Sequence, residues 1–170
     1  MKNQEMKIGG IFTYEHIRDG EVIDTWQEHN IVTNQGLNYV LGAAMAGATT
    51  VTTWYVGLFR NNYTPTATDT AAVFPGSGVA NEATTAVLTN SVRPTWTQAG
   101  ASLQNVTNSA SPAVFTFNAS TNIYGAFLVS SNVLGGTTGT LAAGSQFASV
   151  RAMLTADVLN VTYSLSVASA

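Results

Sequence analysis

Runs of apolar and β-forming residues predict strands over most of the chain. The run DVLNVTYSLSV (157–167) alternates between apolar and polar residues, as a strand with one wet face does. The runs TWYVGLF (53–59) and IYGAFLVSS (123–131) show no alternation, which indicates strands that are covered on both faces. Further strands are predicted at 86–97, 101–107, 113–118 and 146–154. Together the runs favour a mainly β protein built as a sandwich.

The two apolar runs need a cover on each face. We expect the opposing sheet on one face, and the helix, a long loop or another subunit on the other. Residues 61–85 are rich in Pro, Gly, Ser, Thr and Asn and predict such a long loop. Gly57 and Gly125 lie inside the two runs, which indicates a bulge or a close approach of another group to the backbone.

One helix is predicted within NIVTNQGLNYVLGAAMAG (30–47). Thr33 or Asn34 can cap its start, and Gly47 suits its end. Apolar residues recur inside it at spacings of three and four, namely Leu37, Val40, Leu41, Ala44 and Met45.

Residues 6–28 predict a β-hairpin, because Asp19-Gly20 can supply the positive φ angles of a two-residue turn. If Arg18 faces Glu21, both faces of the hairpin mix apolar and charged residues. Such a hairpin does not seal a core in the usual antiparallel way. We therefore expect an N-terminal arm over residues 1–28 that lies against another subunit, followed by a sandwich domain over residues 29–170.

Seven residues are predicted to contact a partner. Five lie on the arm, and two are aromatic residues beside prolines and loops; they are Phe12, Tyr14, Ile17, Val22 and Trp26, with Tyr63 and Trp96.

Charge is scarce and unevenly placed. Charged residues make up 9% of the 170 positions, and nine of the fifteen lie in the first 28. Few charges give little repulsion between copies, which favours assembly. The six Lys and Arg residues form no basic stripe, so nucleic acid is not an expected partner. No window approaches a membrane span and the start lacks a secretory signal, so we expect synthesis in the cytoplasm and no membrane partner.

Residues suited to catalysis or metal binding do not cluster in the sequence. The histidines His16 and His29 each follow a glutamate, and neighbouring residues of a strand point to opposite faces, so neither pair chelates a metal. Glu15 faces Asp24 in the expected register, but an exposed hairpin offers no pocket for an acid pair. The chain has no cysteine and no Gly-x-Ser-x-Gly motif. We expect no cofactor, no metal and no enzymatic activity.

The order HNIVTNQGLNYVL, TWYVGLF, IYGAFLVSS, GGTTGTLAAGSQF, DVLNVTYSLS resembles a family of small structural proteins of tailed bacteriophages that decorate or cement the capsid. The similarity spans about residues 26–167. It implies a jelly-roll-like antiparallel β-sandwich that assembles as dimers or trimers on the capsid surface of the virion and clamps neighbouring major capsid proteins. It implies no catalytic residues.

Two other functions remain open at this point. A phage tail or fibre component would share the same low charge and lack of reactive groups. A carbohydrate-binding module could use Trp96, Tyr63 and loop residues as a stacking surface.

Overall fold

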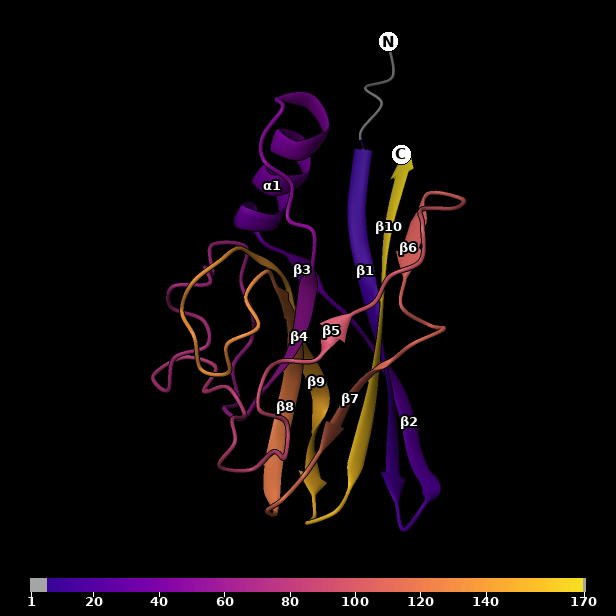
Figure 1. The fold of residues 1–170 in the computed structure, drawn as a ribbon, viewed down its shortest axis with the longest axis vertical. Helices are drawn as coiled ribbons and strands as arrows, with labels where there is room; N and C mark the ends of the chain where they lie inside the picture. The colour runs from indigo at the N-terminus through magenta and orange to yellow at the C-terminus, as the bar shows by residue number, and fades with distance from the viewer. Residues whose placement is uncertain (1–5, 170) are drawn as a thin grey trace.

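The computed structural model describes residues 6–169 as two antiparallel sheets packed face to face, with one helix beyond one end of the sandwich (Figure 1). Sheet A contains β2 (Glu21–His29), β1 (Met6–Arg18), β10 (Val158–Ser169) and β6 (Asn105–Thr107) in that order, and β7 (Ala113–Thr116) also pairs with β10. Sheet B contains β3 (Ile31–Val32), β9 (Leu141–Met153), β8 (Thr121–Val129), β4 (Trp54–Phe59) and β5 (Thr95–Trp96). The predicted β-sandwich with one short helix is confirmed.

The hairpin of β1 and β2 turns at Asp19-Gly20, where both residues have positive φ angles of 52° and 83°, as a two-residue turn requires. The expected pairing of Arg18 with Glu21 is correct. Beyond Ile17 the register shifts at a β-bulge, so His16 pairs with Asp24 instead of Ile23. This bulge makes the predicted faces of the hairpin wrong over most of its length.

The bulge places the aromatic residues of β1 and β2 on one face of the hairpin, together with charged residues such as Asp24 and Glu28. It brings Tyr14 opposite Trp26, and the two rings stack with centroids 5.0 Å apart. Phe12 and Tyr14 are fully buried in the main core. β1 also pairs with β10 along its whole length, from Met6–Ser169 to Ile17–Val158. Residues 6–28 are therefore a central part of sheet A and are not set apart as an arm; residues 1–5 lie outside the described residues.

The two unalternating runs form β4 and β8, which are neighbours in sheet B. Their inner residues belong to the core between the sheets. Their outer face is covered by the long loop, which buries Phe74 against Phe59 and Phe127. The sequence allowed the helix, a long loop or another subunit as the outer cover, and in the structure it is the long loop.

Gly57 and Gly125 allow two reciprocal contacts between a ring and the backbone in sheet B. Gly57 pairs with Phe127, and Phe59 pairs with Gly125. A Cβ on either glycine would overlap the ring of its partner. The predicted close approach is confirmed, and it locks the register of β4 against β8.

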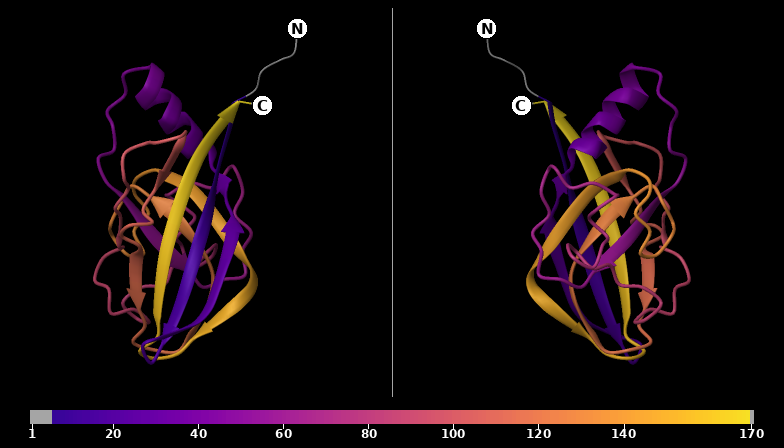
Figure 2. Two further views of the ribbon diagram at one scale, coloured as in Figure 1. Left: turned by 90° about the vertical axis from the view of Figure 1, so that its right-hand side faces the viewer. Right: turned by 90° about the vertical axis from the view of Figure 1, so that its left-hand side faces the viewer.

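Helix α1 (Asn34–Met45) starts after Thr33, whose side chain accepts a hydrogen bond from Gly36 N at 3.1 Å. The predicted cap at Thr33 is confirmed. Gly36 lies against the backbone of Ala142 in β9, with no space for a Cβ. This contact fixes the first turn of α1 to sheet B, while the last turns extend beyond the sandwich (Figure 2).

Two predicted strands are much shorter in the structure. Only β5 forms within 86–97, and only β6 forms within 101–107. Residues 86–94 run as turns that bond to residues near β7; for example, Asn90 Nδ2 donates to Val114 O. Side-chain bonds to the backbone offer an alternative to ladder pairing, which explains why β-forming residues stay outside the sheets.

Candidate functional site

Three of the seven predicted contact residues are core residues. Phe12 and Tyr14 are fully buried, and Trp96 is 5% exposed. The Trp96 indole donates to Tyr163 O at 3.0 Å, which satisfies its one polar group inside the core. These three side chains are inaccessible to a partner in this fold, so their assignment as contact residues is corrected. Phe12 and Tyr14 are buried because β1 pairs with β10 and its inner face packs into the core between the sheets.

The other four predicted residues do not form one patch. Trp26 is half-buried between Tyr14 and the Arg151 guanidinium, which lies 4.3 Å above its ring. Tyr63 is half-buried and donates to Asp69 at 2.8 Å. Ile17 is half-buried, while Val22 is 51% exposed beside the hairpin turn. Of the four, only Ile17 and Val22 are paired with each other, across the hairpin.

Exposed apolar side chains occur instead at the end of the sandwich that carries α1. Gly36 is the only buried residue of this helix. Leu41 is 52% exposed and Met45 is 86% exposed, and Met6 at the start of β1 is 61% exposed. The ends of β1 and β10 lie at the same end of the molecule as α1 (Figures 1 and 2). We call this surface, with Leu103 described next, the uncharged end.

Leu103 adds an unusual feature to the uncharged end. It is 89% exposed, in a turn that lies beside the end of β10 because Gln104 O accepts from Val167 N at 3.0 Å. Leu103 and Gln104 both have positive φ angles, of 50° and 59°. This conformation is unfavourable for a bulky residue and is associated with functional segments.

Charge is nearly absent from the uncharged end. No Lys, Arg, Asp or Glu occurs between Glu28 and Arg60, between Arg93 and Arg151, or after Asp157. Those stretches contain all of α1, β6 and β10. Among the described residues of these elements and residues 6–10 at the start of β1, Lys7 alone is charged. A solvent-facing helix ordinarily carries charges on its outer face, so α1 has the composition of a contact surface.

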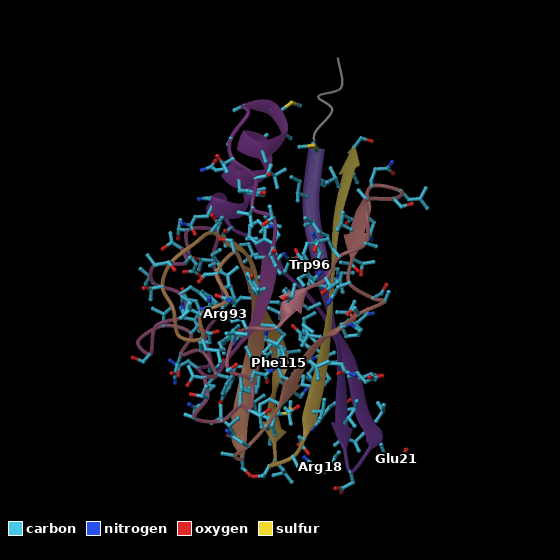
Figure 3. All side chains as sticks on the ribbon, viewed as in Figure 1. Arg18, Glu21, Arg93, Trp96 and Phe115 are labelled. Atoms are coloured by element: carbon cyan, nitrogen blue, oxygen red, sulfur yellow. The ribbon has the colours of Figure 1, made fainter. Side chains whose placement is uncertain are left out.

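The opposite end carries the hairpin turn, with Arg18 and Glu21 labelled in Figure 3. Here the Asp157 carboxylate accepts from Arg18 Nε and Nη2 at 2.8 and 2.7 Å and from Leu154 N at 2.7 Å, and lies 2.8 Å from His16 Nε2. These bonds, those from Arg18 above all, hold the pKa of Asp157 well below its usual range. The cluster ties the β9–β10 turn to β1.

A second charged group is fully enclosed. Arg93 and Glu82 form a bidentate ion pair, with both bonds at 2.7 Å and both side chains at 0% exposure. Arg93 also donates to Ser131 O and Gly136 O, and Gly135 N donates to Glu82. Burial raises the pKa of Glu82, and the bonds from Arg93 and Gly135 oppose that rise. Because all its bonds are internal, the pair joins two loops and has no access to a substrate.

The arrangement of acids and histidines differs from that of a metal or acid-pair site. Glu15 faces Thr25 instead of Asp24, which corrects the expected opposition. Within residues 6–169 there is no group of three or more His, Asp, Glu or Cys that could hold a metal ion. None of the helical segments that the structure describes has the length and apolarity needed to cross a lipid bilayer.

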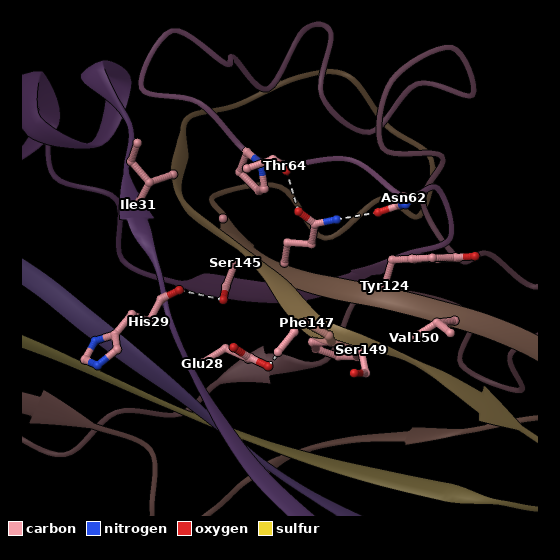
Figure 4. Close-up of a pocket in the computed structure, with 14 residues that line it drawn as sticks. Glu28, His29, Ile31, Asn62, Thr64, Tyr124, Ser145, Phe147, Ser149 and Val150 are labelled. Atoms are coloured by element: carbon pink, nitrogen blue, oxygen red, sulfur yellow. Dashed lines mark hydrogen bonds between the residues drawn. The ribbon is translucent and has the colours of Figure 1, made fainter.

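A groove of about 710 Å³ lies between the end of β2, residues 62–65 and β9. The groove forms where the chain leaves sheet A after His29 and joins sheet B at Ile31. A bulge in β9 adds to it. In the β8–β9 ladder Ile123 pairs with Arg151 and Gly125 with Gln146, so residues 147–150 stand opposite Tyr124 alone. Figure 4 shows Tyr124 on the same side of the groove as Asn62 and Thr64, and Gln146 forms hydrogen bonds with both Asn62 and Thr64.

No protein-family model matches the chain, and no curated protein matches it. The function is therefore inferred from the fold and from three surfaces, namely the uncharged end, the charged hairpin end and the groove beside β9.

Proposed function

We propose that this protein is a structural component of a virion, a decoration or cement protein that attaches to the assembled capsid through its uncharged end. The observation that carries the proposal is the exposure of Leu41, Met45, Met6 and Leu103 at an end where Lys7 is the one charged residue among the described residues of α1, β6, β10 and the start of β1. Burying that surface removes apolar area from water without stripping water from charges. The resemblance to phage structural proteins supports the same function.

The partners in this proposal are the major capsid protein and further copies of the chain, as a dimer or trimer. Each copy binds the shell and not its dissociated subunits, so binding stabilises the shell by mass action. A modest contact energy is multiplied over many equivalent sites of a symmetric particle. The rigid sandwich keeps the geometry of each contact the same.

The expected strength of the contact follows from the exposed side chains. Fully burying a Leu or Met side chain contributes about 1.5–3 kcal/mol. Leu41 is already half-buried and Met45 is almost fully exposed. Together they contribute roughly 2–4 kcal/mol, which corresponds to an affinity change of about 30- to 700-fold.

The test has two parts. Mass spectrometry of purified infectious particles determines whether the chain is present, and in how many copies per particle. Binding of the purified chain to particles that lack it is then measured for Leu41→Asp/Met45→Asp. A matched control is Val73→Asp, because Val73 is 57% exposed in the long loop outside the uncharged end.

We expect many copies per particle, loss of binding in the double variant, and unchanged binding in the control. Absence of the chain from particles would refute the proposal. A copy number of a few per particle would instead favour a tail or fibre component, which can use the same end for attachment.

A further inference from the structure

The groove beside β9 is separate from the uncharged end, because none of the residues that line it belongs to α1, β6 or β10. Its volume of about 710 Å³ lies in the range of roughly 300–1,000 Å³ that is typical of sites for small ligands. We propose that this groove binds a neutral oligosaccharide.

The groove has a fixed shape before any ligand binds. Ser145 Oγ donates to His29 O at 2.9 Å, and Ala148 N donates to Glu28 Oε1 at 2.7 Å. These bonds join the two walls across the floor (Figure 4). The bulge also turns Phe147 inward, where its ring packs edge-on against Tyr14 and Trp26. A preformed site loses little conformational entropy on binding.

Uncharged polar groups line the upper wall. The Gln146 amide accepts from Thr64 Oγ1 and donates to Asn62 Oδ1. After these bonds Gln146 retains one N–H and one lone pair, and Asn62 retains both amide N–H groups. Neighbouring hydroxyls of a sugar each donate and accept, so a row of fixed amide donors and acceptors matches them. The bonds among the three side chains also hold the row in place.

An aromatic ring supplies the apolar part of the site. Tyr124 lines the groove opposite the bulge, and it is half-buried against the cluster around Phe74. That packing limits the movement of the ring. A pyranose presents C–H groups on one face, and these pack on an aromatic surface while its hydroxyls bond elsewhere.

Charge in the groove selects against anionic ligands. The lining residues include the Glu28 carboxylate and no Lys or Arg. A phosphate, sulfate or carboxylate on the ligand would find no cation and would be repelled by Glu28. Nucleotides and acidic sugars are therefore disfavoured, and neutral sugars remain.

The structure changes which residues a carbohydrate hypothesis uses. Trp96 and Tyr63 were the sequence-based candidates, but Trp96 is buried, and neither residue lines the groove. Tyr124 and Gln146 take their place. The proposal depends on the groove alone and does not require attachment to a virion.

The experiment uses the full chain and three neutral probes, namely cellopentaose, maltopentaose and N-acetylchitopentaose. Binding is measured by calorimetry and by amide shift changes in NMR spectra. We expect one of the probes to bind with shift changes at 145–150, and Gln146→Ala and Tyr124→Ala to weaken that binding tenfold or more. The matched controls Gln27→Ala and Tyr55→Ala lie outside the groove lining and should bind as the wild type does.

Tyr124 also packs against the core, so its alanine variant could lose stability. Asn62→Ala removes an exposed side chain and keeps the test valid if Tyr124→Ala does not fold. The proposal is overturned if none of the three probes binds, if a sulfated pentasaccharide binds in their place, or if binding is unchanged by Gln146→Ala and Asn62→Ala. None of these outcomes bears on attachment through α1.

Discussion

The buried ion pair of Arg93 and Glu82 gives the sharpest test of how the loops are held. We predict that Arg93→Met lowers the free energy of unfolding by about 3–5 kcal/mol, the usual cost of removing one partner of a buried pair. The reason is that Glu82 is fully buried. Without Arg93 its carboxylate keeps only the bond from Gly135 N among the bonds described above.

The magnitude has two sources in the structure. Arg93 makes two bonds to the carboxylate and two to the carbonyls of Ser131 and Gly136. The residues Ser131 and Gly136 are half-buried, so water can replace part of what their carbonyls lose. Most of the cost therefore comes from the unpaired Glu82 carboxylate, which is fully buried. The double variant Glu82→Leu/Arg93→Met removes that carboxylate, so it should be more stable than Arg93→Met alone.

Urea unfolding followed by tryptophan fluorescence measures these differences. Burial raises the pKa of Glu82, and loss of Arg93 removes the main opposing influence and raises it further. A carboxyl with a raised pKa in the folded state destabilises the fold once pH rises above the unfolded value. The cost of Arg93→Met should therefore grow as pH rises above the unfolded value of about 4.3.

A matched control is Arg151→Met, because the pair of Arg151 with Asp24 is partly exposed. It should cost only about 1 kcal/mol, including the contact with Trp26. The reasoning is refuted if Arg93→Met costs no more than this control, or if the double variant is less stable than Arg93→Met.

Three further predictions concern stability. Gly57→Ala places a Cβ against the Phe127 ring and should lower the free energy of unfolding by about 1–3 kcal/mol. Gly9→Ala serves as the control, because its Cβ meets no atom within 4 Å. Equal unfolding midpoints for the two variants would contradict the close contact. Asp157→Asn should lower the free energy of unfolding by about 1.5–3 kcal/mol near neutral pH. Because the pKa of Asp157 is lowered in the folded state, the difference from wild type should shrink as pH falls below about 4. A difference that does not change with pH in urea titrations would argue against an ionised Asp157. Thr33→Val removes the cap of α1 and should lower the free energy of unfolding by about 0.5–2 kcal/mol, with faster amide hydrogen exchange in the helix. Unchanged exchange in the helix would show that the cap is not needed.

The elements predicted with most success are those with a strong local pattern. Thr33 as the cap, Asp19-Gly20 as the turn and Gly57 as a point of close approach are all found in the structure. The cap and the turn depend on backbone conformations or side-chain bonds within a few residues of the chain, whereas Gly57 is indicated as a glycine inside an apolar run. The continuous apolar runs also indicated a two-sided cover, because a buried outer face leaves no polar positions.

The failures arise where one residue changes the register or where distant segments meet. The bulge at Ile23 moves Trp26 beside Tyr14 and makes the hairpin a core element. No local signal marks it, since Ile23 is an ordinary strand residue. The groove depends on an exit from sheet A after His29 and on a bulge at 147–150, more than a hundred residues apart in sequence.

The uncharged end can be recognised in the sequence from the position of the stretches that lack charged residues. Scarce charge over the whole surface favours assembly without locating the contact, and the mixed faces of the hairpin favour a contact there. The absence of charge between Glu28 and Arg60 is the more specific feature, because it includes an entire helix. A helix with exposed Leu41 and Met45 and no charged residue has the character of half an interface.

The distribution of charge along the molecule also implies an orientation for the proposed attachment. The charges of the hairpin turn and the Asp157 cluster lie at the end opposite α1 (Figure 3). Attachment through α1 leaves the exposed charges of the hairpin turn, such as Glu21, in water, whereas attachment through that turn would require their desolvation. A single lysine introduced at Ala44, which is exposed on α1, should therefore weaken binding to particles. A lysine at Glu21, which is exposed at the hairpin turn, should leave that binding unchanged, and the reverse result would place the contact at the hairpin.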